Sequence, residues 1–121
     1  MTLLRFDHVQ LAMPEGREKE ARRFYAGLLG LREVPKPPAL AGRGGCWFEG
    51  REGLRLHLGV ERDFRPARKA HPAFLMCGLR HLVGELRARG FELVEDAPIG
   101  GFDRIFTSGP FGNRIELMEK V

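Results

Sequence analysis

The feature that most constrains the fold is an internal repeat, which places three histidines and one glutamate at matching positions in two halves of the chain. His8 opens the first half and His71 opens the second, whereas His57 and Glu116 lie near the ends of their halves. The spacings agree, with 49 residues from His8 to His57 and 45 residues from His71 to Glu116. Because self-similarity at a fixed period marks a repeated supersecondary unit, the sequence predicts a duplicated fold.

The two halves also show the same order of strand and helix patterns. The first half begins with a strand-like run (3–13) and a helical stripe (14–30) that opens at Pro14 and Glu15 and ends at Gly30. A short strand (31–34), a broken loop (35–45) and two further strands (45–50 and 54–60) follow. The second half repeats this order, with strands at 71–77, 91–94, 103–108 and 113–119 and a helical stripe at Leu79, Leu82, Val83 and Leu86 that ends at Gly90.

This order predicts an α+β fold of two tandem βαβββ modules, residues 1–62 and 63–121, which together form one compact domain. We expect a curved, mixed sheet with the shape of a cup, with the helices on its outer face. At 121 residues, 43% of them hydrophobic, the chain is long enough to bury one core.

The alternation of side chains along the strands separates the repeated polar residues from the aliphatic ones. In residues 54–60 the leucines share one face and leave Arg55 and His57 on the other. Arg114 and Glu116 likewise lie opposite the aliphatic residues of their strand, and His8 lies opposite those of the first strand. If the polar faces curl inward, these side chains line the cup. Imidazole nitrogens and carboxylate oxygens are donors that suit a borderline divalent metal.

Composition argues against several other classes of protein. The net charge of +4 is spread along the chain with no nucleic-acid motif, so a small anionic substrate is favoured over a nucleic-acid partner. No apolar stretch approaches the ~20 residues that cross a membrane, and the first residues lack an export signal. A cytoplasmic location is expected. Cys46 and Cys77 stand in apolar, strand-like contexts without metal-site spacing, which predicts two reduced thiols in the core.

Several segments together resemble the vicinal oxygen chelate superfamily, which includes glyoxalase I, fosfomycin-resistance thiol transferases, extradiol dioxygenases and metal-free bleomycin-resistance proteins. They are DHVQLAM with the following ARRFYAGLLGL, the HPAF that starts the second half, and the closing GPFGNRIELME. The last segment is similar to the usual DPxGN turn and acidic strand of the superfamily, with Gly109 in place of the aspartate. The resemblance covers essentially the whole chain.

The resemblance implies a divalent metal held by His8, His57, His71 and Glu116, with nickel, cobalt, zinc, manganese and iron as candidates. It also implies a homodimer, in which the two modules pair either within one chain or across the two subunits. Glyoxalase I usually has glutamate where this chain has His57, which weakens that reading. The fosfomycin-transferase pattern needs only the equivalents of His8, His71 and Glu116. A triad of two histidines and one carboxylate would also suit a ferrous dioxygenase, although those enzymes usually carry more modules.

We therefore expect a metal-dependent enzyme that acts on a small oxygen-rich substrate, either a glyoxalase-like isomerase or lyase, or a thiol transferase. The metal would act as a Lewis acid, with Glu116 as the catalytic residue that could shuttle a proton. Arg55, Arg114, Gln10 and Trp47 are the candidates for substrate contacts, although the two arginines could equally form charge pairs at the rim. The segment with Arg65, Arg68 and Lys69 is either a solvated linker or a guard of the pocket entrance. The alternative function is a metal-free protein that sequesters a drug or metabolite, as bleomycin-resistance proteins do.

Overall fold

The computed structural model describes residues 1–121 and divides the chain into two compact units, Met1–Phe64 and Arg65–Val121. Each unit contains a four-stranded mixed sheet and the element order βαβββ. The predicted α+β fold with a repeated βαβββ module is confirmed. None of the helices has the length and apolar character needed to cross a membrane.

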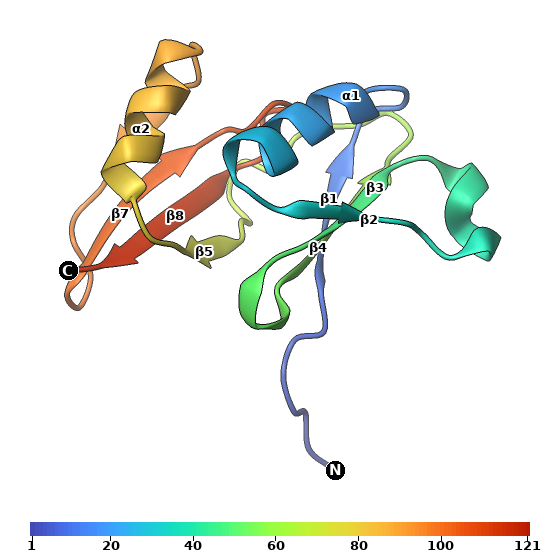
Figure 1. The fold of residues 1–121 in the computed structure, drawn as a ribbon, viewed down its shortest axis with the longest axis horizontal. Coiled ribbons are helices and arrows are strands. Elements are labelled where there is room, and N and C mark those ends of the chain that lie inside the picture. Colours follow the sequence, from blue (N-terminus) through green and yellow to red (C-terminus); the bar gives the residue numbers. More distant parts are fainter. The chain divides into compact units, whose positions relative to one another are not determined.

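The first unit consists of a sheet with the strand order β1-β4-β3-β2 and a helix that covers one face of it (Figure 1). Strand β1 runs parallel to β4, whereas β3 is antiparallel to both β4 and β2. The helix starts as α1 and continues in π-helical geometry as η1. The bounds are β1 Val9–Met13, α1 Glu18–Ala21, η1 Arg22–Leu28, β2 Arg32–Val34, β3 Cys46–Glu49 and β4 Arg55–Val60.

The aliphatic face of this sheet packs against the buried side of the helix. The helix contributes Ala21, Phe24 and Tyr25, and the sheet contributes Leu11, Met13, Cys46, Phe48, Leu56 and Leu58. Gly30, with φ of 76°, ends the helix in the left-handed conformation that the sequence pattern predicted. The face with Trp47 and His57 is therefore left for the candidate site.

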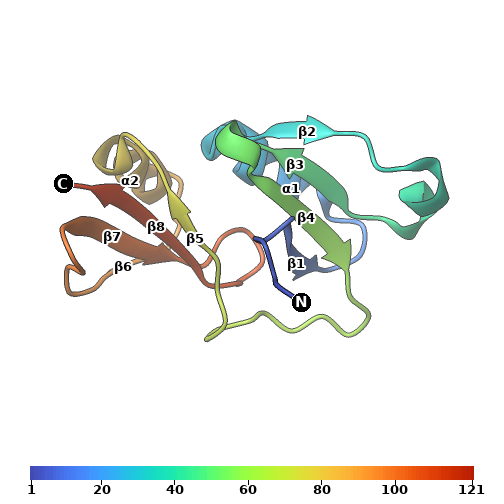
Figure 2. The same cartoon turned by 90° about the horizontal axis from the view of Figure 1, so that it is seen from below.

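The second unit repeats the architecture with the strand order β5-β8-β7-β6 (Figure 2). Helix α2 buries the predicted stripe of Leu79, Leu82, Val83 and Leu86. At the start of this helix the Glu119 carboxylate accepts hydrogen bonds from the backbone N–H groups of Gly78 (2.7 Å) and Leu79 (3.0 Å). The bounds are β5 Ala73–Leu75, α2 Leu79–Ala88, β6 Leu93–Glu95, β7 Phe102–Thr107 and β8 Ile115–Lys120.

Three local predictions were wrong. The first strand begins at Val9 instead of residue 3, because Val9 pairs with Leu56 near the start of β4 and the residues before it extend past that strand. The first helix begins at Glu18 instead of Pro14, since Gly16 has φ of 77° and interrupts the helical backbone. The loop of residues 35–45 contains a regular element, the 3₁₀ helix η2 (Pro38–Arg43).

The two cysteines lie in different environments, which corrects the prediction that both are core thiols. Cys46 is buried beneath the helix of the first unit, whereas Cys77 is exposed just before α2. Both are free. Burial raises the pKa of the Cys46 thiol to about 11, so almost none of it is thiolate at neutral pH.

Under native conditions we expect one thiol to react rapidly with Ellman's reagent and the other to react only on unfolding. The exposed Cys77 supplies the fast phase, because the thiolate is the nucleophile and Cys46 is both buried and protonated. A Cys77→Ser variant should lose the fast phase and keep the slow one. A fast phase that survives in this variant would contradict the assignment.

Candidate functional site

In the first unit, β1 and β4 bring two of the predicted ligands together. His8 immediately precedes β1, and His57 lies in β4, where it is opposite Gln10 in the parallel ladder. The two imidazole rings stack with centroids 4.1 Å apart and an interplanar angle of 20°. His57 is buried, whereas the His8 side chain is 42% exposed and so has room to reorient.

Trp47 covers the other face of the His57 ring. Its position opposite His57 in the β3–β4 ladder places the two rings 3.8 Å apart and almost parallel. The pKa of His57 is lowered, mainly because burial disfavours the charged ring and secondly because His8 is nearby. A lowered pKa keeps the imidazole neutral, which is the form that binds metals.

Asp7 orients the His8 ring, a role that the sequence analysis did not assign. Nδ1 of His8 donates to the Asp7 carboxylate at 3.0 Å, so the lone pair of the neutral ring is on Nε2. This hydrogen bond is the main reason that the pKa of Asp7 is lowered. The parity of the predicted strand gave no sign of this contact, because it placed Asp7 on the opposite face from His8.

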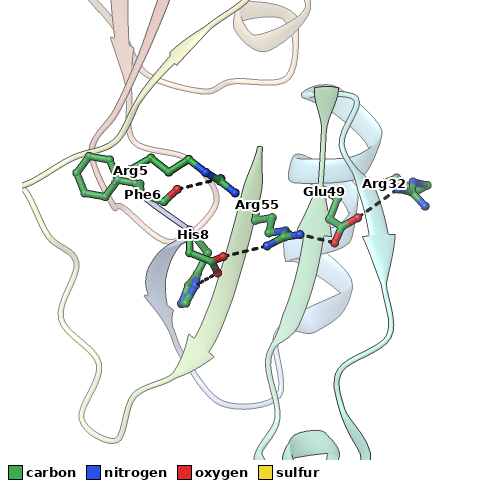
Figure 3. Close-up of polar contacts among 7 residues, drawn as sticks. Arg5, Phe6, His8, Arg32, Glu49 and Arg55 are labelled. Atoms are coloured by element: carbon green, nitrogen blue, oxygen red, sulfur yellow. Dashed lines mark hydrogen bonds and ion pairs between the residues drawn. The ribbon is translucent and has the colours of Figure 1, made fainter. Parts of the chain in front are cut away.

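Arg55, a predicted substrate contact, binds carboxylates of the protein. Its guanidinium lies 3.0 Å from Asp7 and 3.9 Å from Glu49, and Glu49 in turn pairs with Arg32 at 3.3 Å (Figure 3). The predicted charge pair is therefore present, and it holds Asp7 in place. The side-chain amide of Gln10, another predicted substrate contact, lies over Gly59 of β4, where a Cβ atom would be 2.6 Å from its nitrogen.

In the second unit, the other two predicted ligands are in direct contact. Nε2 of His71 lies 3.0 Å from Oε1 of Glu116, and Nδ1 of His71 donates to the backbone oxygen of Lys69 at 2.8 Å. A carbonyl oxygen can only accept, so Nδ1 carries a hydrogen and a neutral ring has its lone pair on Nε2. That lone pair would face a carboxylate oxygen. A positive charge is therefore needed between the two atoms, either a second ring proton or a metal ion.

Arg104 fixes the other oxygen of Glu116 and was missed by the sequence analysis. Its guanidinium lies 3.1 Å from Oε2 of Glu116 and 3.2 Å from Asp96, and it donates to the Ala97 carbonyl at 2.9 Å. The Arg104 side chain is only 10% exposed. Parity could have revealed it, because Arg104 and Phe106 in β7 share the face of Glu116.

Arg114, the other predicted substrate-binding arginine, forms no ion pair. It packs its guanidinium over the ring of Phe106, 3.9 Å from the ring centroid. The same ring is nearly perpendicular to the imidazole of His71, with centroids 5.4 Å apart and an interplanar angle of 84°. Arg114 and the pair of His71 and Glu116 are thus neighbours of one aromatic side chain.

The structure therefore brings the four predicted ligands together as two pairs, one in each unit. His8 lies with His57, and His71 lies with Glu116. No group of three or more histidine, cysteine, aspartate or glutamate side chains is arranged to hold a metal. The donor chemistry fits a divalent metal: two donors that bind one ion at ~2.1 Å lie roughly 3.0–3.4 Å apart, which includes the separation of His71 and Glu116.

Comparison with known proteins identifies similar structures. No family model and no curated protein matches the sequence. A protein of the glyoxalase family from Bacillus anthracis is 44% identical, with a TM-score of 0.91 over 100% of this chain and 98% of that one. A glyoxalase/dioxygenase from Nostoc punctiforme is 19% identical (TM-score 0.76, 95% and 90% covered). The fosfomycin resistance protein FosX from Listeria monocytogenes is 14% identical (TM-score 0.76, 99% and 96% covered). The last two similarities concern the fold alone.

Proposed function

This chain belongs to the glyoxalase family of the vicinal oxygen chelate superfamily, and on that premise we propose that it is a metal-dependent enzyme acting on a small oxygen-rich substrate. The proposed reaction is a glyoxalase-like isomerisation or lyase step, or the addition of a thiol. We propose His8, His57, His71 and Glu116 as the metal ligands, in a homodimer whose modules pair within a chain or between subunits.

The contact of His71 with Glu116 is the observation that carries this proposal. His71 lies between two hydrogen-bond acceptors, the Lys69 carbonyl and the Glu116 carboxylate. A neutral imidazole has only one N–H and so can donate to only one of them. A divalent metal resolves the conflict, because the Nε2 lone pair and Oε1 are both donors to a cation.

The surrounding residues favour the tautomer of His8 and His71 in which Nε2 carries the lone pair. Asp7 and the Lys69 carbonyl each accept a hydrogen bond from Nδ1 of a histidine, which directs Nε2 of His8 and of His71 toward a ligand. Arg104 occupies Oε2 of Glu116, so that Oε1 alone is free for the metal. When bound, the metal would supply Lewis-acid polarisation of a substrate oxygen.

The residues around Glu116 also limit its part in proton transfer. Arg104 lies 3.1 Å from Oε2 of the carboxylate, so only Oε1 is available to accept a proton. We therefore assign Glu116 a catalytic role mainly as a ligand, with proton transfer confined to moments when Oε1 is free.

The test is the metal content of untagged protein, measured by inductively coupled plasma mass spectrometry before and after incubation with nickel, cobalt, zinc, manganese and iron salts. We expect about one divalent ion per complete set of four ligands. The loaded protein is then assayed for isomerisation of a thiohemiacetal and for thiol addition to an epoxide. A protein that takes up no metal would refute the proposal and favour the sequestering function.

Replacing Arg104 with methionine is expected to weaken metal binding by about tenfold or more, because outer partners of metal ligands typically contribute 10–100-fold to affinity. The change leaves Oε2 of Glu116 without the guanidinium 3.1 Å away. Isothermal titration calorimetry with the metal found above measures the effect. Arg104→Lys keeps the positive charge and should lose less metal affinity. It remains informative if the methionine variant fails to fold.

Arg80→Met provides the matched control. Arg80 also binds two carboxylates of the second unit, Glu95 and Asp103, but it does not contact Glu116. Its loss should leave metal affinity within about twofold, since exposed ion pairs contribute little beyond their own contact. Equal losses in the two methionine variants would show that Arg104 has no specific effect on the ligand.

A further inference from the structure

The second unit contains a cleft beside the contact of His71 with Glu116. The cleft has a volume of about 270 Å³, and its lining includes Arg68, Glu92, Val94, Phe106, Ser108 and Arg114. Phe106 belongs to both places, because its ring touches His71 edge-on and stands opposite Glu116 in the β7–β8 ladder. A molecule in the cleft would therefore lie next to the proposed ligand pair.

Two arginines in this cleft have no carboxylate partner, unlike the other arginines with structural roles. Arg22, Arg55, Arg80 and Arg104 each bind at least one acid. Arg114 instead rests on Phe106, and Arg68 forms neither an ion pair nor a hydrogen bond. Glu92 is the one acidic residue of the lining, so two positive side chains face one negative one. The cleft thus has a net positive charge and guanidinium N–H donors without acceptors.

The backbone holds the two arginines next to each other. The N–H of Arg114 donates to the Ala67 carbonyl at 2.8 Å, and the N–H of Ala67 donates to the side-chain oxygen of Asn113 at 2.9 Å. Asn113 is itself buried. Ala67 and Arg68 are consecutive, as are Asn113 and Arg114, so these two bonds tie the segments that carry the arginines. The arrangement is formed before any ligand arrives, which lowers the entropic cost of binding.

We propose that this cleft binds an anionic group of the substrate, with Arg68 and Arg114 as its main donors and the Ser108 hydroxyl as a further one. The shared chemistry is that of a carboxylate, phosphate or phosphonate, whose oxygens match the planar fork of a guanidinium. The binding of an anion in the cleft does not depend on the proposed function. Only the statement that this anion is part of the substrate rests on it, and the substrate would then be a small oxygen-rich anion.

The experiment measures anion binding to protein that has been stripped of metal with a chelator, so it does not depend on the metal site. Inorganic phosphate and acetate are titrated separately at constant ionic strength, and backbone amide and arginine Nε–Hε shifts are followed by heteronuclear NMR. We expect saturable shifts that include Arg68 and Arg114. The tighter of the two probes identifies the anion as tetrahedral or planar.

Arg114→Gln and Arg68→Gln are each expected to weaken this binding by about tenfold, the usual contribution of a hydrogen bond to a charged group. Arg87→Gln is the matched control, since Arg87 is an exposed residue of α2 outside the cleft and the variant has the same change in charge. It should bind within about twofold of the wild-type protein. Arg68 makes no ion pair or hydrogen bond whose loss would disturb folding, so this variant remains informative if Arg114→Gln unfolds.

Two results would overturn the inference: neither probe binds saturably, or Arg87→Gln weakens binding as much as the cleft variants do. Metal content distinguishes this failure from that of the proposed function. Anion binding in a protein that takes up no metal would support the anion-binding cleft and refute the proposed metalloenzyme. Full metal content without anion binding would support the metalloenzyme and refute the anion-binding cleft.

Discussion

Replacing His71 with alanine is expected to lower the bound metal to less than about a tenth of the wild-type content. In the proposed site His71 would supply the Nε2 atom that lies 3.0 Å from Glu116, and a metal site that loses one of its protein ligands loses most of its affinity. Metal content after gel filtration measures the effect. Glu116→Gln, which keeps the shape of the side chain and removes its charge, should give the same result.

His81→Ala is the control for this experiment. His81 belongs to the same unit, but its side chain is 85% exposed on α2 and lies near only Glu85. Its replacement should leave the metal content unchanged. The fluorescence of Trp47, the chain's only tryptophan, gives a second measurement of metal binding. Its ring stacks on that of His57, a proposed ligand, with centroids 3.8 Å apart. Undiminished metal content in His71→Ala would remove His71 from the ligand set.

Replacing Gly45 with alanine is expected to destabilise the first unit by at least about 3 kcal/mol. Gly45 has φ of 82°, and a Cβ atom there would lie 2.1 Å from the backbone oxygen of Leu58. Neither the main chain of β4 nor that of β3 can move away without breaking the ladder between Cys46 and Leu58. The free energy of unfolding in urea, followed by the fluorescence of Trp47 in β3, measures the loss.

Gly53→Ala separates backbone strain from the clash. Gly53 has a nearly identical φ of 80°, but no atom lies within 4 Å of the position of its Cβ. Alanine should therefore cost only about 1–2 kcal/mol there, the usual penalty for a left-handed conformation. If both variants lose the same free energy of unfolding, the clash of the Gly45→Ala side chain with the Leu58 oxygen has no effect. Backbone strain alone would then explain both losses.

The repeat in the sequence was sufficient to predict the two βαβββ modules and the faces of their strands. Periodicity placed Leu79, Leu82, Val83 and Leu86 on the buried side of α2, and parity placed His57 and Glu116 opposite the aliphatic runs. These inferences succeed because the spacing of side chains along a helix or strand is fixed by local backbone geometry.

The ends of elements could not be predicted in the same way. Residues 3–8 have aliphatic and aromatic side chains that are typical of a strand, but Leu3, Leu4 and Phe6 are exposed because β4 has no residues to pair with them. Cys77 lies in an apolar run and is nevertheless exposed. A strand requires a partner at its own register, and the sequence of one strand does not say where its neighbour begins.

The sequence by itself determined which side chains are candidates for the site and which face of each strand carries them, because both follow from residue type and local period. Only the tertiary structure decided the partners of those side chains. It placed Arg104 on Glu116, Asp7 on His8 and the Lys69 carbonyl on His71, and it left Arg68 and Arg114 without acids. The physical reason is that hydrogen bonds and ion pairs depend on distances of about 3 Å between individual atoms, which are fixed only when the strands and loops pack.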